Sequence, residues 1–131
     1  MDSLDRVLMQ MDLQFVGNAQ HKITPAALMA DEQAVLLDVR TEEEVATVSC
    51  DFHYHLRSLH VPLHRLPVEF QQVPVDRNVG IFCPLSVRAA VAYTYLRSKG
   101  YKNVYVLDGG LAALIDEAGP GPVLAKLEAI Q

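Results

Sequence analysis

Short apolar runs constrain the fold of this chain more than any other feature. They lie at 35–39 (VLLDV), 79–82 (VGIF) and 103–107 (NVYVL). The first shows no alternation of apolar and polar residues and the second is wholly apolar, which is typical of strands covered on both faces. Helical signals lie between the runs, so strands and helices alternate along the chain. The sequence therefore predicts an α/β domain with a parallel sheet and helices on both faces.

Capping residues and helical spacing indicate the helices. Thr24 followed by Pro25 is typical of a helix start, and Thr41 with Glu44 has the pattern of a capping box. The remaining elements are expected as helices over 1–15 (with Ser3 as N-cap), 65–73, 89–96, 111–117 and 123–130, a short strand at 60–63, and a chain break at 119–122.

The connection CPLSVR at 83–88 joins the second strand to the helix that follows it. Cys83 therefore stands at the carboxyl end of a strand, the edge at which open α/β sheets bind ligands. The N–H groups of the turn and the helix N-terminus both favour a thiolate over a thiol. Arg88, in the first helical turn, can point back over the loop. Cys83 is thus the candidate nucleophile; the alternative is a cysteine that only fills the core.

Composition limits the class of protein. With 131 residues, half of them apolar, the chain has the size of one domain with a real core. A net charge of −5 gives no electrostatic reason to expect nucleic acid or an anionic membrane as a partner. Two cysteines do not make a secreted disulfide framework, and the start MDSLDRVLMQMDLQF lacks the apolar core of a signal peptide. We therefore expect a cytoplasmic protein with Cys83 as a free thiol.

Five segments carry a family resemblance: ITPAAL, LLDVRTEEEV, HVPLHRLP, IFCPLSVRAA and LRSKGYKNVYVLDGGLAAL, in this order. Together they resemble the rhodanese family of sulfurtransferases, in its single-domain form. The resemblance implies a rhodanese-like fold with about five parallel strands, and sulfur transfer through a persulfide on Cys83 without a metal or organic cofactor. The chain then divides into an N-terminal helical extension (1–20), the rhodanese-like domain (21–118) and a C-terminal helical tail (119–131).

Loop length separates two activities of this fold. Four residues stand between Cys83 and Arg88, which resembles the sulfurtransferase form; related phosphatases and arsenate reductases have one more. A tetrahedral oxyanion needs a wider ring of N–H donors than one sulfur atom does. The resemblance assigns catalysis to Cys83 and Arg88. The substrate-binding part of the loop comprises Pro84, Leu85, Ser86, Val87 and Ala89.

The loop departs from the family pattern at two positions. Pro84 stands where a basic residue often follows the cysteine, and Ser86 where a glycine is common. Pro84 also removes one inward N–H donor. Because Leu85 and Val87 are apolar, Arg88 is the only formal charge of the loop. We therefore expect weak activity with thiosulfate, a dianion, and better use of a small low-charge sulfur donor or a persulfide-bearing protein.

Asp38 and Arg40 end the first long strand, near the same edge of the sheet as Cys83. In one interpretation they border the pocket, and they are candidate substrate-binding residues on that ground. In the other, which we favour, Arg40 pairs with Glu44 and Asp38 ties loops together. The sequence leaves both open.

Four histidines lie in or near one long connection: His53, His55, His60 and His64. The spacing His-x-His is known among metal ligands, but no cysteine or carboxylate pattern supports it, so we expect loop histidines and no metal. Cys50 could resolve the persulfide as a disulfide; an idle thiol is the preferred interpretation.

A second function stays open beside sulfur transfer. The altered loop is compatible with a non-catalytic rhodanese-like module that binds a partner, with Cys83 vestigial and the terminal helices as the interface. The retention of Cys83 and Arg88 argues against it. The sequence does not identify the donor, the acceptor, the partner or the oligomeric state.

Overall fold

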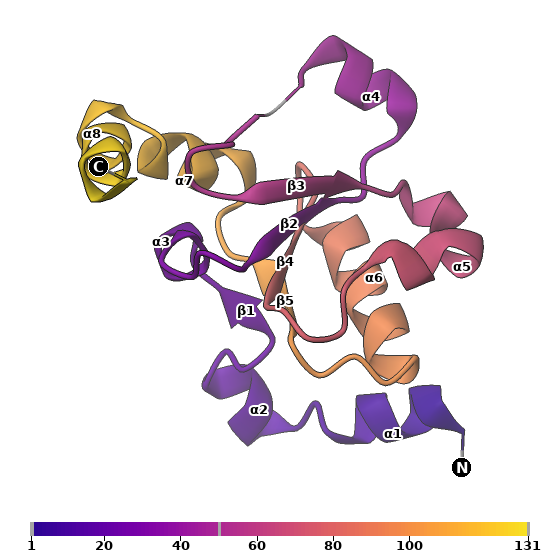
Figure 1. The fold of residues 1–131 in the computed structure, drawn as a ribbon. Helices are drawn as coiled ribbons and strands as arrows, with labels where there is room; N and C mark the ends of the chain where they lie inside the picture. The colour runs from indigo at the N-terminus through magenta and orange to yellow at the C-terminus, as the bar shows by residue number, and fades with distance from the viewer. Residues whose placement is uncertain (1, 50, 131) are drawn as a thin grey trace.

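A five-stranded, wholly parallel sheet forms the centre of the computed structural model, which describes residues 2–49 and 51–130 (Figure 1). In spatial order the strands are β1 (Lys22–Ile23), β5 (Val104–Leu107), β4 (Val79–Phe82), β2 (Val35–Asp38) and β3 (Arg57–His60). The three apolar runs of the sequence form the inner strands β5, β4 and β2, each with a strand on either side. The predicted α/β fold with about five parallel strands is confirmed.

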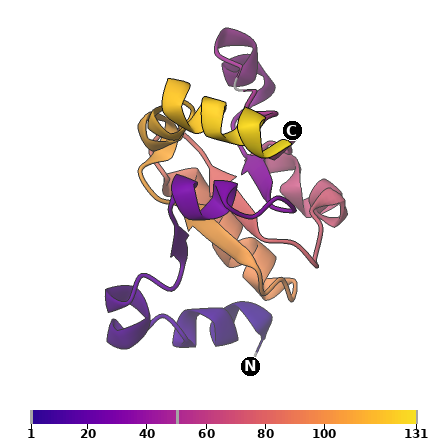
Figure 2. The same cartoon turned by 60° about the vertical axis from the view of Figure 1, so that its left-hand side comes forward.

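Helices cover both faces of the sheet, as predicted (Figures 1 and 2). One face carries α5 (Leu66–Glu69) and α6 (Val87–Ser98), and the other carries α3 (Pro25–Met29) and α7 (Gly110–Glu117). The side chains of β2 alternate between the two faces, with Leu37 in the first hydrophobic cluster and Leu36 in the second. A strand buried on both faces in this way needs apolar residues without alternation.

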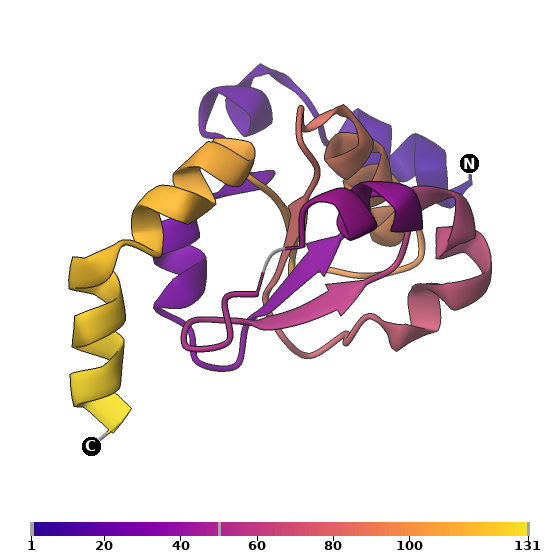
Figure 3. The ribbon, with the colours of Figure 1, turned by 90° about the horizontal axis from the view of Figure 1, so that it is seen from above.

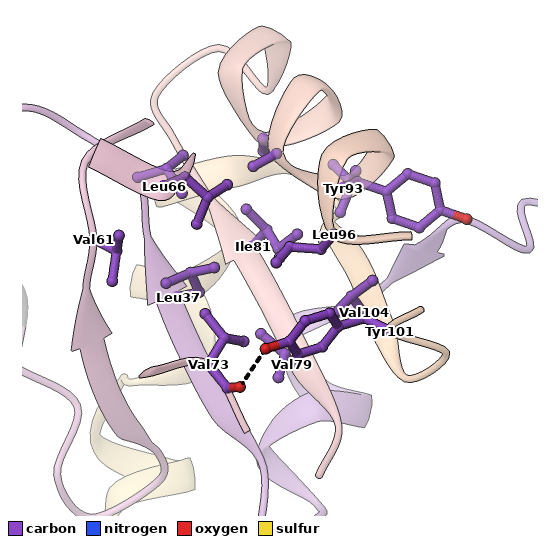
Figure 4. Close-up of a cluster of buried hydrophobic side chains, with 14 of the residues drawn as sticks. Leu37, Val61, Leu66, Val73, Val79, Ile81, Tyr93, Leu96, Tyr101 and Val104 are labelled. Atoms are coloured by element: carbon purple, nitrogen blue, oxygen red, sulfur yellow. Dashed lines mark hydrogen bonds between the residues drawn. The ribbon is translucent and has the colours of Figure 1, made fainter. Parts of the chain in front are cut away.

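The cluster beneath α6 also contains a buried polar group (Figure 4). Leu37 and Ile81 are fully buried at its centre. The hydroxyl of Tyr101 donates to the backbone oxygens of Phe70 (2.9 Å) and Val73 (2.7 Å). The loop after α6 is thereby tied to the segment that leads into β4.

The N-terminal segment forms two short helices where one was expected. α1 (Ser3–Met9) is capped by the side chain of Asp2, not by Ser3, and lies against α6. α2 (Leu13–Gly17) has its own N-cap, Asp12, whose carboxylate accepts a backbone N–H hydrogen bond of 3.0 Å. The single-helix prediction is wrong because aspartate stabilises a helix start better than a helix interior.

The strand expected at 60–63 lies three residues earlier, and the two-residue β1 was not expected at all. The pairing of β3 with β2 explains why β3 begins earlier than expected. β3 matches all four residues of β2, from Val35 opposite Arg57 to Asp38 opposite His60. This long-range register, and not local composition, determines where β3 begins.

The predicted caps at Thr24 and Thr41 are confirmed, the latter as a full capping box at the start of α4 (Glu42–Thr47). The single helix expected over 65–73 is wrong. In its place α5 is flanked by two 3-10 turns. They are η1 (Leu63–Arg65) and η2 (Phe70–Gln72).

The C-terminal helix α8 (Pro120–Ile130) begins earlier than predicted, so the break expected over 119–122 is confined to Ala118 and Gly119, between α7 and α8. Proline is tolerated in the first helical turn because its missing N–H is not needed there. The Nζ atom of Lys126 donates to the backbone oxygen of Met29 at 2.7 Å, which holds α8 beside α3 (Figure 3). The division of the chain at residues 20 and 118 stays a prediction.

None of the helices within the described ranges has the length and apolar composition that crossing a membrane requires.

Tyr101→Phe tests the polar part of the core. We expect the variant to lose about 1–3 kcal/mol of unfolding free energy, because the buried backbone oxygen of Val73 loses the Tyr101 hydroxyl, while that of Phe70 keeps the N–H of Val73 as a donor. Urea unfolding followed by circular dichroism measures the loss. Tyr105→Phe is the control, since the Tyr105 hydroxyl has no hydrogen bond among the described residues. If both substitutions lower the unfolding free energy by the same small amount, the stabilising role given to the Tyr101 hydroxyl is wrong.

Candidate active site

Cys83 follows directly after β4, at the carboxyl edge of the sheet and just before α6. Its side chain is buried, with 2% of the residue exposed. The backbone N–H of Ala89 donates to Sγ of Cys83 at 3.2 Å. A donor from the first turn of a helix stabilises negative charge on sulfur, so the sequence of β4, loop and α6 creates an anion-stabilising position at Sγ.

Ser86 shapes the loop between Cys83 and α6. It has φ of 65° and ψ of −6°, in the left-handed region that non-glycine residues rarely adopt. This position is the one where the family often has glycine, and the backbone conformation supplies the reason. The cost for a side chain there is on the order of 1 kcal/mol, and the surrounding contacts must compensate for it.

The start of α7 packs against the backbone of the loop. A Cβ added at Gly110 would lie 3.3 Å from the backbone oxygen of Pro84 and 3.7 Å from that of Cys83. Gly110 also has φ of 59°. The DGG segment therefore does more than form a tight turn: its second glycine allows α7 to approach the backbone of Cys83 and Pro84 closely.

The rim of the site is apolar and faces solvent. Pro84 is exposed, Leu85 is 85% exposed and Val87 is 70% exposed. The buried sulfur therefore lies below a rim without formal charge, apart from the neighbouring Arg88.

Arg88 makes a two-pronged ion pair with Glu44 of α4. Its Nη1 lies 2.5 Å from Oε1 and its Nη2 lies 2.8 Å from Oε2. The hydrogen bonds that Arg88 donates to Glu44 raise the pKa of Arg88, and nearby Cys83 adds to the increase. The same contact with Arg88, with help from the Thr41 backbone N–H, lowers the pKa of Glu44 to about 2. Both side chains are therefore charged at neutral pH.

Sequence reasoning missed the role of Glu44 in the site. It assigned Glu44 to the capping box, and Oε1 does accept from the backbone N–H of Thr41 at 3.0 Å. Both carboxylate oxygens of Glu44 also accept hydrogen bonds from Arg88. The sequence did contain a signal for this ion pair. The helix α4 follows β2 and the loop with Cys83 follows β4, so both lie at the same carboxyl edge of the sheet.

The predicted pair between Arg40 and Glu44 is wrong. Arg40 is 3% exposed, and its Nε and Nη2 bind the carboxylate of Asp38 at 2.8–3.1 Å. Its Nη1 donates to the backbone oxygen of Val48 at 2.8 Å. Asp38 and Arg40 thus bind each other and hold the segment that carries α4, a framework role; contact of either with substrate stays a prediction.

The histidines do not gather into a metal site: across 2–49 and 51–130, no three side chains of His, Cys, Asp or Glu are placed to hold an ion. His60 contacts the backbone oxygen of Arg40 through Nε2 at 2.7 Å, and His53 lies beside Asp51. Cys50 lies outside the described residues, so its role as a resolving thiol stays open.

Comparison with known proteins decides the family. Residues 25–117 match the family described as "Rhodanese-like domain". The chain belongs to this family. A sulfurtransferase of Allochromatium vinosum is 36% identical over 86 residues, covering 65% of this chain and 76% of that protein. The rhodanese-like chain is therefore homologous to sulfurtransferases.

Solved structures agree with this assignment. A rhodanese-related protein from Thermoplasma volcanium has a TM-score of 0.61 at 25% identity, covering 76% of this chain and 95% of its own. The human single domain sulfurtransferase TSTD1 has a TM-score of 0.58 at 22% identity, covering 74% of this chain and 96% of its own. The second likeness supports the rhodanese fold alone.

Glu44→Gln tests the ion pair through its pH dependence. A lowered folded-state pKa means that the pair stabilises the fold fully above pH 4.5, the ordinary value, and that this stabilisation is lost as the pH falls toward 2. We expect the variant to be less stable than the parent near neutral pH, with a difference that shrinks below pH 4.5. Urea unfolding across this range measures it.

Glu43→Gln is the matched control, because it makes the same charge change on α4 and its side chain has no hydrogen bond or ion pair among the described residues. A difference for Glu44→Gln that is independent of pH, or equal to that of the control, would contradict the role of the pair.

Proposed function

We propose that this chain is a rhodanese-type sulfurtransferase that carries sulfane sulfur as a persulfide on Cys83. The hydrogen bond from the N–H of Ala89 to Sγ of Cys83, 3.2 Å long, is the observation that carries the proposal. An N–H aimed at the sulfur from the first turn of α6 stabilises the thiolate that must attack and later leave. Family membership supports the same class of reaction.

The reaction runs in two balanced steps. The Cys83 thiolate attacks the outer sulfur of a donor R–S–SH; one S–S bond forms, the other breaks, and the electron pair leaves with R–S⁻. A thiophilic acceptor then attacks the outer sulfur of the Cys83 persulfide and regenerates the thiolate. Donor and acceptor exchange one sulfur atom, so neither step requires an external oxidant, a metal or an organic cofactor.

The loop and Arg88 both stabilise the negative charge on the sulfur of Cys83. The backbone N–H groups of 85–89 hold the terminal sulfur of the persulfide, in the manner of an oxyanion hole. Arg88 contributes a positive charge beside Cys83 and acts together with Glu44, which fixes the direction of the guanidinium. The cytoplasm suits this chemistry, because a reducing compartment keeps Cys83 free as a thiol.

Charge at the rim determines the preferred donor. Thiosulfate carries two negative charges that must leave water to reach the buried Sγ of Cys83. Arg88 is already paired with Glu44, and the exposed rim residues Leu85 and Val87 carry no charge. A low-charge persulfide, or the persulfide of a partner protein, avoids most of this cost. Thiosulfate is therefore a poor donor in this proposal.

Intact-mass measurement after incubation with a low-molecular-weight persulfide tests the site. The parent chain should gain one sulfur atom, Cys83→Ser should gain none, and Cys50→Ser should behave like the parent. The added sulfur should disappear with cyanide or a thiol. If Cys50→Ser is the inactive variant, the assignment to Cys83 is wrong. If the parent gains no sulfur, the non-catalytic binding module is the better function.

Leu85→Arg tests the argument on donor charge. Its exposed position can accept the longer side chain, and a cation there compensates part of the charge of thiosulfate. We expect kcat/KM for thiosulfate to rise several-fold, up to about tenfold, because solvent screens an exposed charge. The value for a neutral persulfide should change little. Val75→Arg, which adds the same charge at an exposed position before β4, is the control. Equal gains for both donors would refute the argument.

A further inference from the structure

A large cavity lies at the edge of the sheet opposite to the loop that carries Cys83. It has a volume of about 820 Å³ and lies between the segment 51–58 and α8. Because Arg57 is the first residue of β3, the cavity opens at the amino edge of the sheet, whereas Cys83 follows the carboxyl end of β4. A second cavity of about 330 Å³ adjoins it and shares His55, Lys126 and Ala129. These sizes suit a small molecule.

Positive groups with unused donors line this cavity. The guanidinium of Arg57 has no hydrogen bond or ion pair among the described residues. Lys126 uses one donor on the backbone oxygen of Met29 and has two more. A carboxylate could accept hydrogen bonds from both side chains.

His55 is a buried polar group without a partner. It lines both cavities, is 7% exposed, and its Nε2 has no hydrogen-bond partner among the described residues. Burial lowers the pKa of His55 and nearby Lys126 lowers it further, while Glu117 acts in the opposite direction. The ring is therefore neutral near pH 7 and can donate one N–H. A buried polar atom without a partner is costly, so a ligand oxygen in reach of it has a stabilising effect.

The acidic residues of the cavity limit the charge of the ligand. Asp51 is engaged with His53, through the ring at 3.3 Å and the backbone N–H at 3.1 Å. Glu32 has no side-chain hydrogen bond or ion pair among the described residues and adds a negative charge to the lining. The cations Arg57 and Lys126, beside the unpaired carboxylate of Glu32, favour a ligand with a single negative charge over a polyanion.

The remaining surface suits a flat apolar body. Tyr54 is 45% exposed, and the centroid of its ring lies 4.2 Å from the centroid of the His53 ring. Ala129 and Ile130 of α8 add apolar surface. We propose that this cavity binds a small organic monoanion with an aromatic ring, its carboxylate at Arg57 and Lys126 and its ring beside Tyr54.

An NMR titration with 2-naphthoate and its neutral amide, 2-naphthamide, tests the proposal on the full chain. Naphthoate should shift the amide resonances of 53–58 and 126–130 in a saturable way, and naphthamide should bind at least several-fold more weakly. Arg57→Gln should weaken naphthoate binding about tenfold, because a charged hydrogen bond is lost, and should leave naphthamide unchanged. Arg6→Gln, an exposed cation on α1, is the charge control and should change neither.

Ala129→Phe provides an independent steric test, since Ala129 is exposed at the chain surface yet lines both cavities. It should abolish binding of both probes without affecting persulfide formation on Cys83. Equal affinity for the acid and the amide, shifts without saturation, or the same response of Arg57→Gln and Arg6→Gln would overturn the proposal. Persulfide formation is measured separately, so the outcome here does not depend on the sulfur-transfer reaction.

Discussion

The ion pair between Arg88 and Glu44 joins the two halves of the candidate active site. Glu44 belongs to α4, which follows β2, and Arg88 belongs to α6, which follows β4. Because β2 and β4 are paired in parallel, both helices start from the same edge of the sheet. One carboxylate thus caps α4 through Thr41 and orients the guanidinium beside Cys83. The same contact compensates the positive charge of Arg88, the only formal charge of the loop 83–88.

The loop 83–88 depends on contacts on both of its sides. Ser86 adopts a left-handed conformation that a free peptide would rarely keep, so neighbouring structure must hold it. The N–H of Ala89 binds the sulfur on one side, and the start of α7 at Gly110 lies against the backbone of Pro84 on the other. A side chain at Gly110 would separate α7 from the loop. The glycine that follows β5 and the cysteine that follows β4 therefore belong to one structural unit.

Local signals in the sequence predicted the inner strands, the caps at Thr24 and Thr41, and the position of Cys83, because each depends on residues close in the chain. Two predictions that depended on distant partners were wrong, whereas the parallel sheet with helices on both faces is confirmed. The start of β3 follows from its register with β2, and the partner of Arg40 is Asp38 because both side chains are buried together. Glu44 was assigned to its capping box and to a pair with Arg40; its ion pair with Arg88 was missed because it depends on the parallel pairing of β2 and β4.

The features at the two edges of the sheet are built from different parts of the chain. Cys83 and its supporting residues all lie within 25–117, the part that matches the rhodanese-like family. The cavity at the amino edge is closed by Lys126 and Ala129 of α8, which lie beyond that match. A parallel sheet separates its two edges by the length of its strands, four residues here, or roughly 13 Å. A helix added after the domain can therefore complete a second binding surface at the amino edge and leave the geometry around the sulfur unchanged.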